Sequence, residues 1–316
     1  MKQFEINSRN EGQRLDKYLF RIVGNGGMSF IYKMIRKKNF VLNDKKATGK
    51  EILKSGDIVK LYISDDTYDK FKTETKGNLN INTDKVFDFK KLIIYEDSDI
   101  ILINKPEGVL SQKAKDEDVS INEYLLSYLS DTGFINNNSL IEYKPSCVNR
   151  LDRNTTGIII AAKTLKAARI ISEGLKSRTI NKYYKCIVDG DFNKEGLYKG
   201  YLVKDENKNK AEILDMPSEN SSLIETEYRL IERNINCSIV EVHLLTGKSH
   251  QIRAHLSYLG FPIIGDKKYG SLNINKKYKA TNQLLHAYKI VFPEYEDSLE
   301  LSFSGKTFVC EPNFRY

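Results

Sequence analysis

The sequence reads Asn149-Arg150-Leu151-Asp152-Arg153-Asn154-Thr155-Thr156-Gly157 where two apolar runs meet. The flanking runs, residues 146–148 and 158–162, are short and largely β-branched, which is typical of buried strands that end in a polar turn. Asp152 is therefore predicted on a loop against a core, between Arg150 and Arg153. Nearby opposite charge favours the ionised carboxylate, which suits a nucleophile or a base. A structural ion pair that shapes the turn is the alternative interpretation.

Composition limits the class of protein. A chain of 316 residues, 40% of them hydrophobic, can form one large domain and one small domain. It has no apolar run of about 18 residues, and residues 1–5 lack an apolar signal core, so we expect a cytoplasmic protein without a membrane span. The four cysteines form no CxxC pair, and His250 and His255 do not have zinc-binding spacing. We therefore expect no disulfide and no metal site.

The positive charge is concentrated near the amino terminus. The whole chain has a net charge of +8, and residues 1–62 contain 14 Lys and Arg against 6 Asp and Glu. The remaining residues are neutral overall, since they hold 36 of each kind. A small basic unit joined to a neutral one predicts a module that binds a polyanion, although a merely soluble basic domain is the alternative.

The basic unit is predicted to contain two helices and a small β-structure. Apolar residues recur at helical spacing over 14–22, and Ser29 is a candidate N-cap for a helix through Lys37. Residues 64–84 are polar without an apolar period, which predicts a flexible linker. We therefore divide the chain into a small basic domain (1–63), a linker (64–88) and a large domain (89–316). Four basic residues crowd the exposed side and end of the second helix: Lys33, Arg36, Lys37 and Lys38.

The large unit mixes strands and helices. Residues 92–105 are predicted to form two strands around a turn, and Thr164 is a candidate cap for a helix through Arg178. Alternation over 182–188 places Tyr184 on one face of a strand. In 244–256, Ser249 is a candidate N-cap for a short helix whose first turn includes Arg253. An ordinary strand tyrosine and an ordinary capped surface helix are the alternatives.

Taken in order, these motifs resemble the RluA-type pseudouridine synthases, with RluC and RluD as the nearest types. The family motif has His and Ser where this chain has Asn149 and Thr156. The resemblance implies that Asp152 is catalytic, that Tyr184 stacks on a flipped base, and that Arg253 pairs with the aspartate. It also implies RNA contacts by Arg150 and Arg153, an alpha-L type RNA-binding domain over residues 1–63, and a catalytic domain over residues 89–316.

The resemblance further implies an α+β fold, with a mixed, mostly antiparallel sheet and flanking helices. The expected activity is isomerisation of uridine in large-subunit ribosomal RNA, without a cofactor, by a monomer. Whether Asp152 attacks the sugar or removes a proton stays open. Three other functions also stay open: a noncatalytic RNA-binding factor in ribosome assembly, a tRNA uridine isomerase, and an aspartate-dependent hydrolase.

Overall fold

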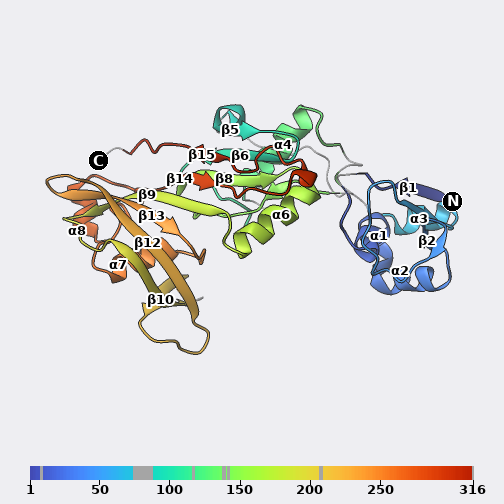
Figure 1. Cartoon of the computed structure of the whole chain (residues 1–316), viewed down its shortest axis with the longest axis horizontal. Helices are drawn as coiled ribbons and strands as arrows, with labels where there is room; N and C mark the ends of the chain where they lie inside the picture. The colour runs from blue at the N-terminus through green and yellow to red at the C-terminus, as the bar shows by residue number, and fades with distance from the viewer. Residues whose placement is uncertain are drawn as a thin grey trace.

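The structure is a computed structural model of the whole chain. It describes residues 1–7, 10–73, 88–115, 118–136, 140, 143–205 and 209–314. Two sheets organise it, a small one near the amino terminus and a large one that carries the rest of the chain (Figure 1).

The amino-terminal unit packs two helices against a four-stranded sheet with the order β1-β4-β2-β3. Its apolar core includes Leu15, Tyr18, Leu19 and Ile22, which confirms the face predicted for the first helix. The second helix begins at Gly27, so the prediction of Ser29 as its N-cap is wrong. The elements are β1 (Lys2–Glu5), α1 (Leu15–Val23), α2 (Gly27–Arg36), β2 (Phe40–Leu42), β3 (Lys45–Lys46), β4 (Ile58–Leu61) and α3 (Asp65–Phe71).

Helix α3 corrects the predicted linker. The prediction of flexible chain from residue 64 is wrong over Asp65–Phe71, which are helical and capped by the Ser64 side chain. The ring of Phe71 lies 4.3 Å from that of Phe30 between centroids, so the helix joins the amino-terminal core. The few apolar side chains of this segment suffice because the core already exists beside them. The rest of the predicted linker, residues 74–87, lies outside the described residues.

The large sheet confirms the predicted α+β class and the mixed, mostly antiparallel arrangement. Its strand order is β11-β10-β12-β13-β9-β14-β8-β6-β5, with β15 paired to β14 and β7 to β8. The β14–β8 pair is parallel, and the other pairs between its described strands are antiparallel. The strands are β5 (Ile93–Glu96), β6 (Ile100–Lys105), β7 (Ser146–Cys147), β8 (Thr156–Ala162), β9 (Asn181–Asp189), β10 (Gly196–Asp205), β11 (Lys210–Leu214), β12 (Ser222–Arg233), β13 (Cys237–Leu244), β14 (Leu285–Val291) and β15 (Thr307–Val309).

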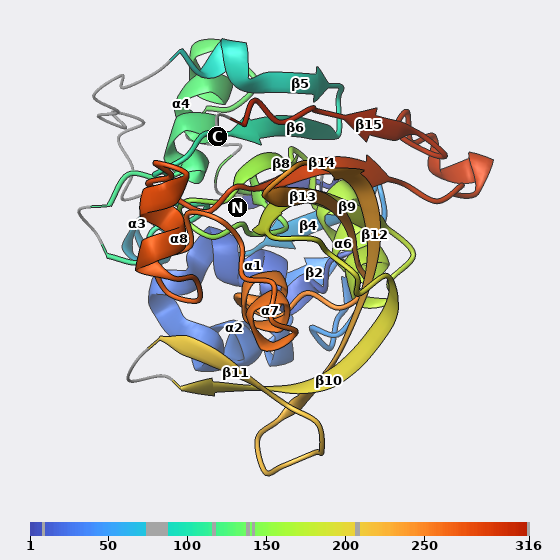
Figure 2. The same ribbon diagram turned by 90° about the vertical axis from the view of Figure 1, so that its left-hand side faces the viewer.

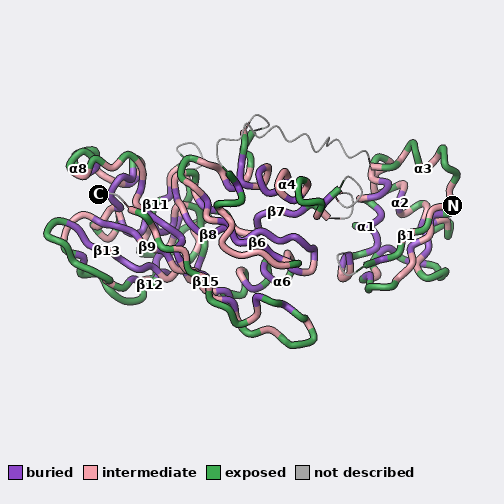
Figure 3. The backbone as a smooth tube through the Cα atoms, turned by 90° about the horizontal axis from the view of Figure 1, so that it is seen from above, coloured by how far each residue is buried: buried purple, intermediate pink, exposed green. Residues whose placement is uncertain are grey.

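Helices cover this sheet unequally. One face packs against α6 and the other against α4, and buried segments run through β6 and β8 between them (Figure 3). At the far end the sheet curls, so that β10 and β11 pass beneath α7 (Figure 2). A small apolar cluster that includes Leu202, Ala211 and Ala254 fills the space between them. The helices of this unit are α4 (Ile121–Asp131), α6 (Leu165–Lys176), α7 (Gln251–Tyr258) and α8 (Leu272–Lys277).

Candidate active site

The loop that carries Asp152 is fixed by the elements on both sides of it. The Ser111 hydroxyl bonds both the amide and the carbonyl of Leu151, each at 2.9 Å. After the loop, β8 begins at Thr156 and pairs with β14 through Thr156 and Gly157, and the φ of Gly157 is +103°. A Cβ atom there would lie 2.2 Å from the carbonyl oxygen of Ala287, so the close approach of the strands requires glycine. Asp152 is thus held at the edge of a rigid core.

Lys105 supports the same loop from below. This lysine is fully buried, and its Nζ donates hydrogen bonds to the carbonyls of Pro106, Val109 and Arg153 at 2.8–2.9 Å. Burial lowers the pKa of Lys105 to about 7, while the charge of Asp152 opposes this shift. Only the ammonium form has three N–H donors, so the three carbonyls are satisfied together only when Lys105 is charged. In its charged form, Lys105 therefore places a positive charge against the Asp152 loop.

Helix α7 delivers the arginine. The helix begins at Gln251, and its N-cap is His250 rather than the predicted Ser249. His250 has the left-handed conformation, with φ of 58°. The Gln251 side chain accepts hydrogen bonds from the Thr246 hydroxyl and the Lys248 amide, which ties the turn to the first residue of the helix. The turn and helix bring the side chain of Arg253 into the cleft.

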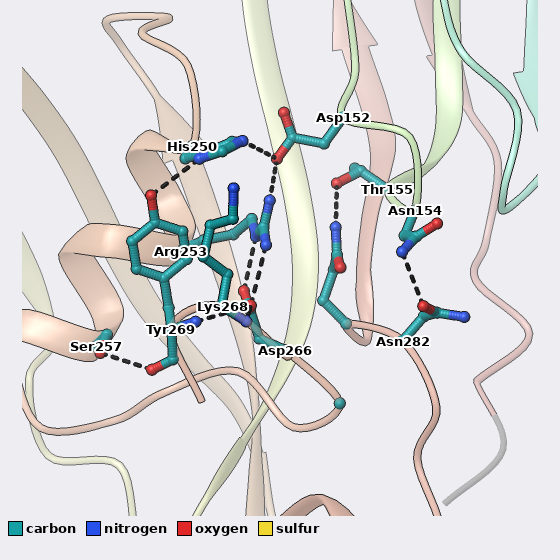
Figure 4. A network of polar contacts seen from close by, with 12 residues as sticks. Asp152, Asn154, Thr155, His250, Arg253, Ser257, Asp266, Lys268, Tyr269 and Asn282 are labelled. Atoms are coloured by element: carbon teal, nitrogen blue, oxygen red, sulfur yellow. Dashed lines mark hydrogen bonds and ion pairs between the residues drawn. The ribbon is translucent and has the colours of Figure 1, made fainter. Parts of the chain in front are cut away.

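Arg253 joins two carboxylates (Figure 4). Its Nε and one terminal nitrogen bind Asp266 at 2.7 and 3.0 Å, and the other terminal nitrogen binds Asp152 at 2.7 Å. Asp266 is fully buried, whereas the Asp152 side chain is 27% exposed. Burial raises the pKa of Asp266, but the hydrogen bonds and charge of Arg253 outweigh it, so that the pKa of Asp266 is lowered. The buried carboxylate fixes the guanidinium, and the guanidinium orients the exposed carboxylate.

Tyr184 lies in the same cleft. It is on β9, buried on the face predicted from the alternation, with Cys186 and Val188 in the same core. Burial, and then the charge of Asp152, raise the pKa of its phenol above the ordinary range, so the hydroxyl stays protonated. Within the described part of the chain, no residue hydrogen-bonds this hydroxyl. Its hydroxyl is therefore available to a molecule bound in the cleft.

The cleft around these residues is strongly basic. It has a volume of about 980 Å³, and Asp152 is the one acidic residue among its described lining residues. Arg150 and Arg153 both line it and are exposed, and Arg153 lies 3.9 Å from Asp118. Neither makes the close contact with Asp152 that their sequence neighbourhood suggested; that contact comes from Arg253. The Lys and Arg residues of the lining are Lys113, Arg150, Arg153, Lys176, Lys182, Lys204, Lys248 and Arg253.

The other predicted binding residues are elsewhere. Lys33, Arg36, Lys37 and Lys38 are exposed at the end of α2, in the amino-terminal unit rather than in the cleft (Figure 1). Over the described ranges, His, Cys, Asp and Glu side chains form no group of three or more that could hold a metal ion. None of the helices in those ranges is both long and apolar enough to cross a membrane.

Comparison with known proteins identifies the family. Residues 99–258 match the RNA pseudouridylate synthase family, and these residues include the Asp152 loop, Tyr184 and Arg253. The chain is 32% identical to an uncharacterized RNA pseudouridine synthase of Mycoplasma genitalium, covering 94% of this chain and 90% of that one.

The chain belongs to the RNA pseudouridylate synthase family.

Membership confirms the resemblance inferred from the motifs and makes the protein a pseudouridine synthase. The chain is also 29% identical to the ribosomal large subunit pseudouridine synthase C of Haemophilus influenzae, covering 96% of this chain and 91% of that one. Its fold is similar to that of human RNA pseudouridylate synthase domain containing 4, with a TM-score of 0.54 and 22% identity over 71% of this chain and 90% of that one.

The geometry adds residues that sequence reasoning missed. Asp266 and Tyr269 belong to the polar network around Arg253, and Lys105 supports the loop from the core. Asp266 carried a weak signal, since it is an acidic residue between Gly265 and two lysines in a short turn. In the sequence, Lys105 is the last residue of a predicted strand, where a polar side chain is usually exposed. Its burial depends on three carbonyls, two of them close in sequence and one 48 residues away.

Proposed function

We propose that this pseudouridine synthase converts specific uridines of large-subunit ribosomal RNA to pseudouridine, with Asp152 as the residue that starts the reaction. The observation that carries the proposal is one partly exposed carboxylate, bound to a fixed guanidinium, in a cleft whose other described charged side chains are all lysines and arginines. The lysine and arginine side chains of such a cleft can bind an RNA phosphate backbone, and the single carboxylate is left to act on the nucleotide.

The reaction needs few groups. The bond between uracil N1 and ribose C1′ breaks, the base turns, and its C5 bonds to C1′; C5 then loses its proton and N1 gains one, so that the product is an isomer of the substrate. A carboxylate oxygen can begin this by attacking C1′ or by removing the neighbouring sugar proton. Arg253 engages Oδ2 of Asp152, and no described residue hydrogen-bonds Oδ1, which leaves this oxygen available to the sugar.

A uridine in structured RNA must leave its stack to reach this carboxylate. Extrusion costs roughly a few kcal/mol, and stacking on an aromatic ring recovers about 1–3 kcal/mol of it. We assign that stacking to Tyr184, which lines the same cleft as Asp152. We assign backbone contacts to Arg150 and Arg153, whose exposed side chains lie at its opening.

We further propose residues 1–63 as an RNA-binding domain that adds affinity without sequence readout. The supporting observation is the exposed basic end of α2, formed by Lys33, Arg36, Lys37 and Lys38. Phosphate contacts by such side chains position a protein on RNA but do not select bases. Large-subunit ribosomal RNA is favoured as the substrate because several relatives are named as ribosomal large subunit pseudouridine synthases. We expect the protein to act as a monomer in the cytoplasm.

The deciding experiment maps pseudouridines in ribosomal RNA and tRNA from cells with the wild-type protein, with Asp152→Asn, and with neither. Loss of specific large-subunit sites in the last two strains, and only there, is the expected result. If pseudouridines are lost only from tRNA, the substrate is tRNA rather than ribosomal RNA. Unchanged maps, together with retained RNA binding in vitro, would favour a noncatalytic assembly factor instead.

A further inference from the structure

A chain of hydrogen bonds fixes the imidazole of His250 (Figure 4). The Tyr269 hydroxyl oxygen accepts the Ala211 amide at 2.7 Å and lies 2.9 Å from Nδ1 of His250. Burial raises the pKa of Tyr269 and lowers that of His250, so the phenol keeps its proton and the ring is neutral near pH 7. Because Nε2 faces the Asp152 carboxylate, a hydrogen is favoured over a lone pair at that nitrogen, which assigns the phenol as the donor to Nδ1 and the ring hydrogen to Nε2.

The backbone holds this ring at the cleft in an unusual conformation. His250 has φ of 58°, which few residues other than glycine adopt, and strain of this kind is common at functional sites. Its Nε2 points toward Asp152 and lies 3.9 Å from Oδ2, beyond hydrogen-bond distance. That oxygen already accepts from Arg253 at 2.7 Å. In the described structure the Nε2–H group has no acceptor, and it lines the cleft beside Asp152.

We propose that His250 donates a hydrogen bond from Nε2 to the 2-carbonyl oxygen of the target uracil. This inference rests on the proposed function, in which Asp152 acts at the sugar. The C2 carbonyl is bonded to N1, the atom that leaves C1′, so it lies close to any sugar carbon that Asp152 can reach. A donor 3.9 Å from the Asp152 oxygen is placed to reach it.

The contact strengthens as the reaction proceeds. When the C1′–N1 bond breaks, its electron pair passes to the uracil and is shared between N1 and O2. A fixed N–H donor stabilises the negative charge that develops on O2, and the same donor adds less to binding of the uncharged base. The proton stays on Nε2 throughout. The argument holds for both routes available to Asp152, because the uracil takes the electron pair in each.

Two amide variants of His250 distinguish the loss of the Nε2 hydrogen-bond donor from a change in backbone conformation. Asparagine tolerates the left-handed conformation but is too short to place a donor at the Nε2 position. Glutamine carries its amide nitrogen about where Nε2 lies. We expect His250→Asn to lower kcat by roughly 10²-fold with little change in KM, and His250→Gln to restore part of it. His243, on the opposite face of the sheet and stacked on Tyr183, supplies the control His243→Asn, which keeps wild-type turnover.

Modified substrates identify the acceptor. The probe is a synthetic RNA stem-loop excised from large-subunit ribosomal RNA around a uridine that the wild-type protein converts. That position carries uridine, 2-thiouridine or 2′-deoxyuridine. Because sulfur is a weak acceptor, the ratio of wild-type to His250→Asn turnover should fall toward one with 2-thiouridine and stay near 10² with 2′-deoxyuridine.

Each other outcome overturns part of the scheme. An unchanged ratio with 2-thiouridine, or a ratio that falls with 2′-deoxyuridine instead, would overturn the contact to O2 while the proposed function stands. Wild-type protein that converts no uridine would overturn the proposed function and this inference with it. Nitrogen-15 NMR of the free protein gives a readout independent of activity: we expect the His250 proton on Nε2, and a proton on Nδ1 would overturn the assignment.

Discussion

Asp152 and Asp266 bind the same guanidinium, but replacing each by asparagine should lower the stability by very different amounts. Asp266 is fully buried and accepts four hydrogen bonds, two from Arg253 and two from the backbone amides of Lys268 and Tyr269. In Asp266→Asn, an amide NH₂ replaces one acceptor oxygen and the charge is lost, which leaves a buried guanidinium with a weak partner. Breaking a buried ion pair in this way costs about 3–5 kcal/mol.

Asp152→Asn should cost far less. The Asp152 side chain is 27% exposed and accepts one hydrogen bond from Arg253, which keeps both of its bonds to Asp266. We expect the unfolding free energy to change by less than about 1 kcal/mol, as for other partly solvated pairs. The two variants therefore make the same change, from carboxylate to amide, next to the same arginine. Asp266 is buried and Asp152 is partly exposed, so the comparison isolates the effect of burial.

The assay combines thermal unfolding with turnover on ribosomal RNA. For a unit of this size, 3–5 kcal/mol corresponds to a fall in Tm of about 6–20 °C for Asp266→Asn, against about 4 °C or less for Asp152→Asn. Turnover should vanish in Asp152→Asn and fall in Asp266→Asn, because Arg253 is then free to leave its position. Equal Tm values for the two variants would refute the conclusion that Asp266 is the anchor of Arg253.

Four further predictions follow from the described geometry. Tyr184→Phe keeps the ring and loses the hydroxyl, so turnover should fall about tenfold, the value of one hydrogen bond; full activity would show the hydroxyl to be dispensable. Gly157→Ala should lower the unfolding free energy by at least about 2 kcal/mol, against about 1 kcal/mol for Gly190→Ala, which has a similar φ but open space around it. Burial lowers the pKa of His255 and of His286 to about 4, below the pKa of about 6.5 that histidine has in the unfolded chain. The free energy of unfolding should therefore fall between pH 6.5 and pH 4, by up to about 1.4 kcal/mol per pH unit for each histidine. Equal free energies from urea unfolding at pH 7 and pH 5 would contradict this. Another variant replaces four basic residues by alanine: Lys33, Arg36, Lys37 and Lys38. The slope of log RNA affinity against log salt concentration should become shallower by up to about 3. An unchanged slope would rule out phosphate contacts by these residues.

Local patterns in the sequence predicted much of the fold. The helix after Thr164 begins where the cap was predicted, because the Thr164 side chain accepts the Ala167 amide within one turn. The strand with Tyr184 has the predicted faces, because side chains alternate along any strand that packs on a core. The predicted start of α7 was wrong by one residue, since the N-cap is His250 rather than Ser249. A serine cap is a local preference, but the interaction of His250 with Tyr269, 19 residues away, decided where the helix begins.

The site was only partly predictable for the same reason. Arg150 and Arg153, near Asp152 in sequence, are exposed at the cleft and make no close contact with its carboxylate, because closeness in sequence does not direct side chains toward one another. The arginine that binds Asp152 is 101 residues away, and its anchor Asp266 is 13 residues further on. The motif resemblance indicated Arg253, but only the structure shows that the buried Asp266 fixes it.

By itself, the sequence determined the strands, most of the helices and the basic amino-terminal unit, and it singled out Asp152 as the candidate for the reacting carboxylate. These depend on periodicity, caps and charge within a few residues, and a linear pattern records them. Only the tertiary structure decided which groups surround that carboxylate: the Asp266–Arg253 pair, Lys105 beneath the loop, and the His250 ring. Each depends on burial and on directed hydrogen bonds between distant segments, and their strength exists only where folding has removed water and fixed the partners in place.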